Sequence, residues 1–175
     1  TITLSGNTYF AVNSTYGSQY SFPGYMSNVR WVKGSAVYDP SASTITVPTA
    51  PLTAVANTKL LILQSSQPVN NNVFLDSSTN NFSITRAGNT TQGTFSPYGE
   101  NWSNYLGGAG NYFQTPASSA STIVGTLSGT ANLTIECWIY PTAYNSSANF
   151  PGLIGDMVAT SENNNWSWGI TNTGT

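Results

Sequence analysis

The chain has few side chains that could carry out acid–base chemistry. Its 175 residues contain no histidine and six carboxylates, which are Asp39, Asp76, Glu100, Glu136, Asp156 and Glu162. Retaining glycoside hydrolases need two carboxyl groups about 5–5.5 Å apart, and one face of a strand can supply such a pair. Glu136 has no second carboxylate on its strand. We therefore predict no catalytic residues, and a Glu136 that pairs with Arg30 or with neighbouring hydroxyls.

Nucleophilic and metal chemistry are equally short of residues. Cys137 is the only cysteine, so this chain cannot form a disulfide within itself, a zinc site or a Cys/His pair. We expect Cys137 to be a buried small hydrophobic residue. Asp156 and Glu162 flank an asparagine-rich loop, but the alternating aspartates of a calcium loop are missing. We predict no cofactor, with Ca²⁺ as the alternative.

Carbohydrate binding is the chemistry that the aromatic residues could support. Sugars stack on exposed rings, while Asn, Ser and Thr offer neutral hydrogen-bonding groups. Four residues are candidates for stacking on a glycan: Trp102, Tyr144, Trp166 and Trp168. Trp166 and Trp168 are two residues apart, so both would project from one face of a strand. The alternative for each is core packing. Trp31 and Trp138 lie inside patterned strands, and we expect them to be structural.

Charge is scarce throughout the chain. Only four residues are basic, the net charge is -2, and charged residues make up 6%. Asn, Ser and Thr together account for 67 of the 175 residues. Four cations cannot neutralise a run of phosphates, so nucleic-acid binding is excluded. No apolar run approaches the roughly 18 residues of a membrane span, so we expect no membrane insertion.

The elements that must position these residues are strands. Gly, Pro, Asn and Ser interrupt every helical pattern, whereas short strand patterns recur between turn clusters. Ten strands are predicted: Thr1–Leu4, Tyr9–Val12, Gly24–Lys33, Lys59–Gln64, Val73–Asp76, Ser83–Arg86, Asn111–Gln114, Leu133–Tyr140, Gly152–Met157 and Trp166–Thr171. The pattern predicts an all-β, antiparallel β-sandwich with little or no helix.

The clearest strand is Leu133–Ile139. Its odd-numbered residues are apolar and should face the core, while Thr134, Glu136 and Trp138 should face a partly wet or covered side. Pro141 should end this strand because it cannot donate to the ladder. Lys59–Gln64 is hydrophobic on both faces, which predicts a strand covered on both sides.

Five stretches carry a family resemblance: LTIECWIYPT (Leu133–Thr142), GYMSNVRWVKGSAVY (Gly24–Tyr38), VPTAPLTAVANTKLLILQSS (Val47–Ser66), DSSTNNFSITRAGNTTQGTFSPYG (Asp76–Gly99) and NYLGGAGNYFQTP (Asn104–Pro116). They resemble segments of the laminin-G-like, concanavalin-A-like jelly-roll domains of bacteriophage virion proteins. The first stretch is similar to the family strand written FTIEFWVYP, the next two to the closing motifs of such a domain, and the last two to its opening motifs. The resemblance implies a jelly-roll sandwich. Glucanases of the same fold carry E-x-D-x-x-E on one strand, a pattern that is absent after Glu136.

The closing motifs come before the opening motifs along the chain. This order predicts that residues 1–69 are the C-terminal part of one laminin-G-like sandwich, and that residues 70–175 are a linker and the N-terminal part of a second. Asn70-Asn71-Asn72 is the candidate linker. The alternative is a single, circularly permuted sandwich.

The resemblance implies a non-enzymatic virion structural protein, a phage fibre or appendage component located on the particle. Because edge strands with few charges need cover, we expect self-association as a homotrimer and contact with other virion proteins. Host polysaccharide is a further expected partner. The alternative function is a glycan-binding lectin or adhesin module of a secreted or cell-surface protein.

Overall fold

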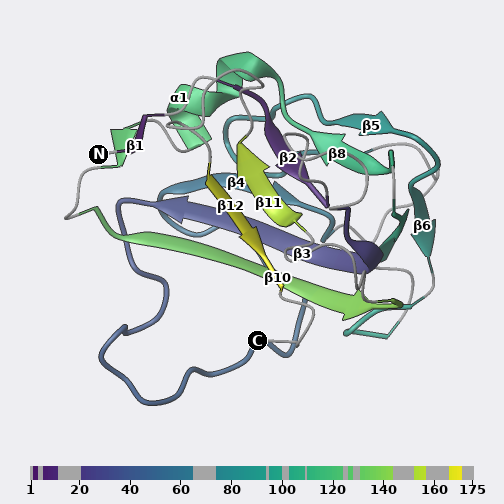
Figure 1. Cartoon of the computed structure of the whole chain (residues 1–175). Helices are drawn as coiled ribbons and strands as arrows, with labels where there is room; N and C mark the ends of the chain where they lie inside the picture. The colour runs from purple at the N-terminus through teal and green to yellow at the C-terminus, as the bar shows by residue number, and fades with distance from the viewer. Residues whose placement is uncertain are drawn as a thin grey trace.

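The computed structural model describes most of the chain, with gaps between its segments. The described residues are 2–3, 6–11, 21–64, 74–93, 95–99, 103–108, 110–123, 126–127, 131–143, 152–156 and 166–170. Within them, two antiparallel sheets pack face to face, as the two layers of strands in Figure 1 show. The prediction of an all-β antiparallel sandwich is therefore confirmed, whereas the jelly-roll connectivity stays a prediction.

Each sheet has five described strands. The first sheet runs β12 (Trp166–Gly169), β11 (Gly152–Asp156), β2 (Thr8–Phe10), β8 (Tyr112–Gln114) and β5 (Thr85–Ala87). The second runs β10 (Leu133–Pro141), β3 (Pro23–Lys33), β7 (Ser103–Gly107) and β6 (Thr91–Gly93), and β4 (Thr58–Ile62) also pairs with β3. A separate pair joins β1 (Ile2–Thr3) to β9 (Thr126–Leu127).

Helix is confined to two short turns in the described residues. These are a 3-10 turn at Ala117–Ser119 and α1 at Ala120–Ile123. Neither is long or apolar enough to cross a membrane. Nine of the predicted strands overlap β-strands, but the segment predicted at Val73–Asp76 contributes only an isolated bridge between Leu75 and Ser83. The sequence patterns missed β6, β7 and β9.

Alternation along β10 was predicted correctly. Leu133, Ile135, Cys137 and Ile139 pack against the core between the sheets. The strand ends at Pro141, as expected. β4 is also covered on both faces, since Leu60 and Leu61 are both buried although they point in opposite directions.

A bulge in β3 decides which side chains enter the core. Strict alternation from Met26 would place Arg30 among apolar side chains. The register instead shifts between Glu136 and Trp138 of β10, opposite Asn28, which adopts a positive φ of 54°. The extra residue reverses the alternation, so that Val29 and Trp31 lie in the core and Arg30 faces outward to Glu136. Trp31 is thus a core residue, which agrees with its predicted structural role.

Segments from both sides of residue 70 build both sheets. β2 lies between β11 and β8 in the first sheet, and β3 lies between β10 and β7 in the second. One core cluster contains Phe10 and Trp31 as well as Phe113 and Ile154. The boundary at residues 69/70 therefore does not separate two packed bodies in this structure, and the proposed linker Asn70-Asn71-Asn72 lies outside the described residues. The assignment of the two segments to consecutive repeats of a longer chain stays a prediction.

Candidate functional site

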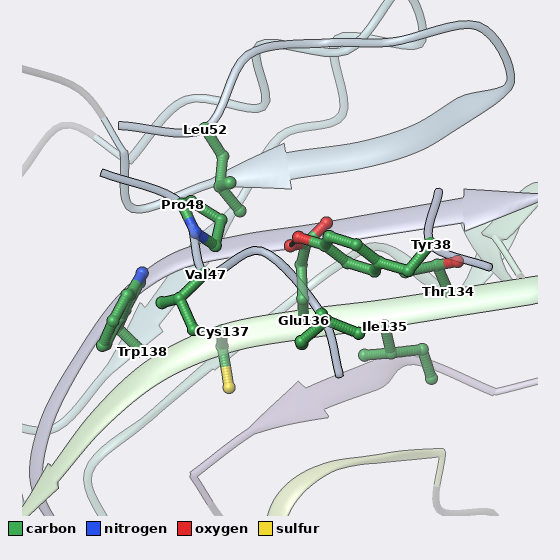
Figure 2. A pocket seen from close by; sticks show the side chains of 10 residues that line it. Tyr38, Val47, Pro48, Leu52, Thr134, Ile135, Glu136, Cys137 and Trp138 are labelled. Atoms are coloured by element: carbon green, nitrogen blue, oxygen red, sulfur yellow. Dashed lines mark hydrogen bonds between the residues drawn. The ribbon is translucent and has the colours of Figure 1, made fainter. Parts of the chain in front are cut away.

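A long excursion between β3 and β4, residues 34–57, covers the outer face of β10. The excursion is the blue loop that swings out below β10 in Figure 1. Figure 2 shows Glu136 and Trp138 pointing from β10 toward Val47 and Pro48 of this excursion, whereas Cys137 points to the opposite side. The outer face of β10 is thus covered by chain rather than by a third sheet.

Arg30, Glu136 and Tyr38 form one cluster beneath the excursion. Arg30 donates from Nε to Oε1 of Glu136 at 2.6 Å, and its Nη2 lies 2.6 Å from the same oxygen in an ion pair. Tyr38 donates from its hydroxyl to Oε2 at 2.5 Å. Arg30 also donates from Nη1 to the carbonyl oxygen of Thr53 at 2.8 Å. Both oxygens of Glu136 are therefore occupied, and the predicted pairing with Arg30 and a hydroxyl is confirmed.

Burial and the Glu136 charge change the acidity of the neighbouring groups. Burial, assisted by the hydrogen bond to Glu136, raises the pKa of Tyr38 to about 12. Burial also raises the pKa of the Cys137 thiol to about 12, and the Glu136 charge adds to this effect. A thiol in this state is not a nucleophile at neutral pH, because the thiolate is the reactive form.

The space between the excursion and β10, which we call the excursion hollow, has a volume of about 320 Å³. Tyr38, Ile45, Val47, Pro48 and Leu52 border it from the excursion, and Thr134–Trp138 border it from β10. Glu136 is the sole charged residue in this described lining, and its oxygens are engaged. The hollow has no pair of carboxylates that could share the work of a general acid and a nucleophile.

Asp76 is likewise occupied by backbone groups. Its carboxylate accepts hydrogen bonds from the amides of Leu61, Ser78 and Phe82 at 2.9–3.0 Å. It therefore fixes the segment beside β4 and is buried there. No group of three His, Cys, Asp or Glu side chains that could hold a metal ion occurs in the described segments. Glu162 and the side chain of Asp156, on which the calcium alternative rests, fall outside what is described.

Of the four predicted stacking residues, the structure describes the surroundings of one. Trp168 lies on β12 and is 40% exposed. Trp166 lies on the same strand, but its side chain is outside the description, as are Trp102 and Tyr144 altogether. The structure therefore places Trp168 at the surface of the first sheet.

A row of tyrosines on the second sheet was missed by the sequence analysis. Tyr140 of β10 lies opposite Tyr25 of β3, which in turn lies opposite Tyr105 of β7. We call these three residues the tyrosine row. The residues come from segments up to 115 positions apart, and Tyr105 lies in a strand that was not predicted. Only the register between strands reveals the row.

Trp138 borders the tyrosine row rather than the core. Its indole Nε1 donates to the hydroxyl of Tyr98, and that hydroxyl lies 3.3 Å from the carbonyl oxygen of Pro48 in the excursion. The two rings meet edge to face at 84°, with their centroids 5.8 Å apart. The predicted structural role of Trp138 fits these contacts, although it is exerted on the outer face.

Comparisons with protein-family models, curated proteins and solved structures found no match for this chain.

Proposed function

We propose that this chain is a non-enzymatic structural module of a virion appendage, such as a phage fibre. One observation supports this most directly: the two segments that carry the family resemblance, Gly24–Tyr38 and Leu133–Thr142, contain neighbouring strands. β3 and β10 pair from Leu133 opposite Lys33 to Pro141 opposite Gly24, and Arg30 and Glu136 bind across the pair. The motif glutamate then serves to hold strands together, which suits a structural role.

The chemistry of the surface supports an extracellular, assembled state. A surface of hydroxyls and amides depends little on salt or pH, because few charges can be screened or titrated. Among the described strands, β10 lies at an edge of the second sheet, and its nine residues carry one charge, that of Glu136, which is paired. Such an edge needs cover from a neighbour. We therefore propose a homotrimer within the particle, in contact with other virion proteins and with host polysaccharide.

The second candidate is a glycan-binding lectin or adhesin module. The exposed ring of Trp168 and the exposed tyrosines of the second sheet favour it, because exposed aromatic rings are the usual platform for sugars. In this candidate the module belongs to a secreted or cell-surface protein.

Immunogold electron microscopy with an antibody against this chain separates the two candidates. Label on fibres, spikes or shells of virus particles is the expected result. Label on cell surfaces without particles would favour the lectin or adhesin. Light scattering of the full-length protein tests the trimer, and a monomer would contradict it.

The absence of catalysis has its own test. Incubation of the chain with polysaccharides should release no new reducing ends. Cleavage that disappears in Glu136→Gln would overturn the non-enzymatic assignment.

A further inference from the structure

The tyrosine row is a cluster of exposed rings rather than part of the core. Tyr140 is 52% exposed and Tyr105 37%, and Phe95 joins them at 47%. The ring centroid of Tyr25 lies 5.1 Å from that of Tyr105, 5.3 Å from that of Phe95 and 6.4 Å from that of Tyr140. The ring centroids of Phe95 and Tyr140 are 4.4 Å apart. The rings support one another at these distances, so their exposed faces are held in fixed positions.

A hollow of about 250 Å³ lies beside this row, and we call it the tyrosine hollow. Trp138 and Tyr140 of β10 form one side, while Phe95, Ser96 and Pro97 close it from the loop. Small residues on the neighbouring strands leave the space open, namely Ser27 of β3 and Ser103 of β7. Tyr140 and Tyr25 lie opposite each other near the C-terminal end of β10 and the start of β3, and Figure 1 shows these two strand ends side by side.

The size and the lining of the tyrosine hollow fit a sugar. Its volume falls just below the roughly 300–1,000 Å³ of sites for drug-sized molecules, which suits a single sugar residue. The described lining carries no charge and combines ring faces with serine hydroxyls. A sugar has the same two-sided character, because its ring faces are apolar and its edge carries hydroxyls.

Ser103 adds an independent observation. It is buried and lines the tyrosine hollow, and its Oγ has no hydrogen-bond partner in the structure. A buried hydroxyl without a partner costs about 1–3 kcal/mol, so it favours a ligand that supplies one. A sugar hydroxyl in the hollow could pair with this Oγ after a rotation of the serine side chain.

We propose that the tyrosine row and the tyrosine hollow form a binding site for a neutral polysaccharide. One sugar residue occupies the tyrosine hollow beside Trp138 and Ser103, and the rest of the polysaccharide continues over the exposed rings of Tyr140 and Tyr105. This inference deepens the proposed contact with host polysaccharide and rests on it.

Affinity electrophoresis in gels that contain a soluble polysaccharide tests the site. The probes are a β-glucan, a mannan, a galactan and dextran, with anionic alginate as the charged comparison. We expect at least one neutral probe to retard the chain. Tyr140→Ala and Tyr105→Ala should each raise the dissociation constant about tenfold, which corresponds to a loss of about 1.4 kcal/mol in binding free energy. Tyr140→Trp should preserve binding.

Two control variants remove exposed side chains elsewhere. Val47→Ala acts on the excursion hollow and Leu75→Ala on an exposed side chain that lines neither hollow, and both should bind as the unaltered chain does. Trp168→Ala is made in parallel and tests the alternative stacking site on the first sheet. Thermal melts followed by circular dichroism confirm that each variant is folded. The melts matter most for Tyr105, the less exposed of the two substituted tyrosines.

Three outcomes would overturn the inference. The first is no retardation by any neutral probe, and the second is loss of binding in Trp168→Ala but not in the tyrosine variants. The third is self-association that Tyr140→Ala abolishes without any sugar binding, which would make the row a contact between copies. The location found by immunogold labelling does not enter this test, so the appendage role and the sugar site can fail separately.

Discussion

Arg30 and Glu136 form a buried ion pair, so removing one charge leaves the other without its counter-charge. Glu136→Gln leaves the guanidinium of Arg30 without a counter-charge, so we expect the free energy of unfolding to fall by about 3 kcal/mol. The double variant Arg30→Met/Glu136→Leu should lose less than the sum of its single variants, because no charge is left buried. Urea denaturation measures all of these values.

Asp39 provides the matched control for this ion pair. Its carboxylate is exposed and accepts hydrogen bonds from the backbone and hydroxyl of Ser41 in its own turn. Asp39→Asn should change the free energy of unfolding by less than about 1 kcal/mol. An equal loss in Asp39→Asn and Glu136→Gln would contradict the central role of the Arg30–Glu136 pair.

The raised pKa of Tyr38 predicts how the stability of the chain changes at alkaline pH. Its pKa is about 12 in the folded chain, against 10 for the ordinary group, because burial and Glu136 disfavour the phenolate. The unfolded state therefore releases this proton first as the pH rises. The stability due to Tyr38 is complete below pH 10 and is lost as the pH rises toward 12.

Comparison with Tyr38→Phe isolates this contribution, because the lysines and the other tyrosines titrate in both proteins. The difference in unfolding free energy between the two should shrink from pH 9 to pH 11.5. A constant difference across this range would show that the phenol of Tyr38 does not titrate differently on folding.

At the scale of elements, Asn28 joins the β3 bulge to the excursion. Its side-chain Oδ1 accepts a hydrogen bond from the backbone amide of Leu52 at 2.7 Å, and its backbone amide donates to the carbonyl oxygen of Leu63 at 2.9 Å. Asn28→Ala would leave the Leu52 amide without its partner and force alanine into a left-handed conformation. We expect a loss of about 3 kcal/mol in urea denaturation.

Two further variants separate the causes. Asn28→Gly should recover about 1 kcal/mol relative to Asn28→Ala, because glycine adopts a positive φ without steric cost. Asn57 also has a positive φ, of 66°, but its side chain is exposed. Asn57→Ala should therefore lower the free energy of unfolding only by the cost of holding alanine at a positive φ, about 1 kcal/mol. Equal losses at positions 28 and 57 would contradict a role for the Asn28 side chain.

The same bulge marks the limit of prediction from the sequence. Alternation located the core face of β10 and the pairing of Glu136, because both follow from local period and from the scarcity of charge. The bulge could not be foreseen, since it depends on long-range pairing. Along one edge, β3 pairs first with β7 and then with β4. The tyrosine row was hidden for the same reason, because strand register is a long-range property.

At the scale of the whole molecule, the two segments on either side of residue 70 depend on each other. Residues 1–69 supply β2, which lies between β11 and β8, and β3, which pairs with β10 on one edge and with β7 and β4 on the other. Of these five neighbours, only β4 comes from residues 1–69. Removing residues 1–69 would take an inner strand from each sheet, and removing residues 70–175 would expose core residues such as Phe10 and Trp31. A partial sheet with an open apolar face is not expected to be stable by itself.

We therefore expect the chain to unfold in one cooperative transition, with coincident far-ultraviolet and tryptophan signals. Fragments 1–69 and 70–175, made separately, should show no cooperative melting, and mixing them should restore it. As a control for chain entropy, a protease site placed at residues 70–72 should allow a nicked chain whose halves stay associated until denaturant is added. Two separate transitions, or independent folding of either fragment, would instead favour two partial domains that belong to consecutive repeats. We expect the single transition because β3 lies between β10 and β7, so its burial depends on strands from residues 70–175.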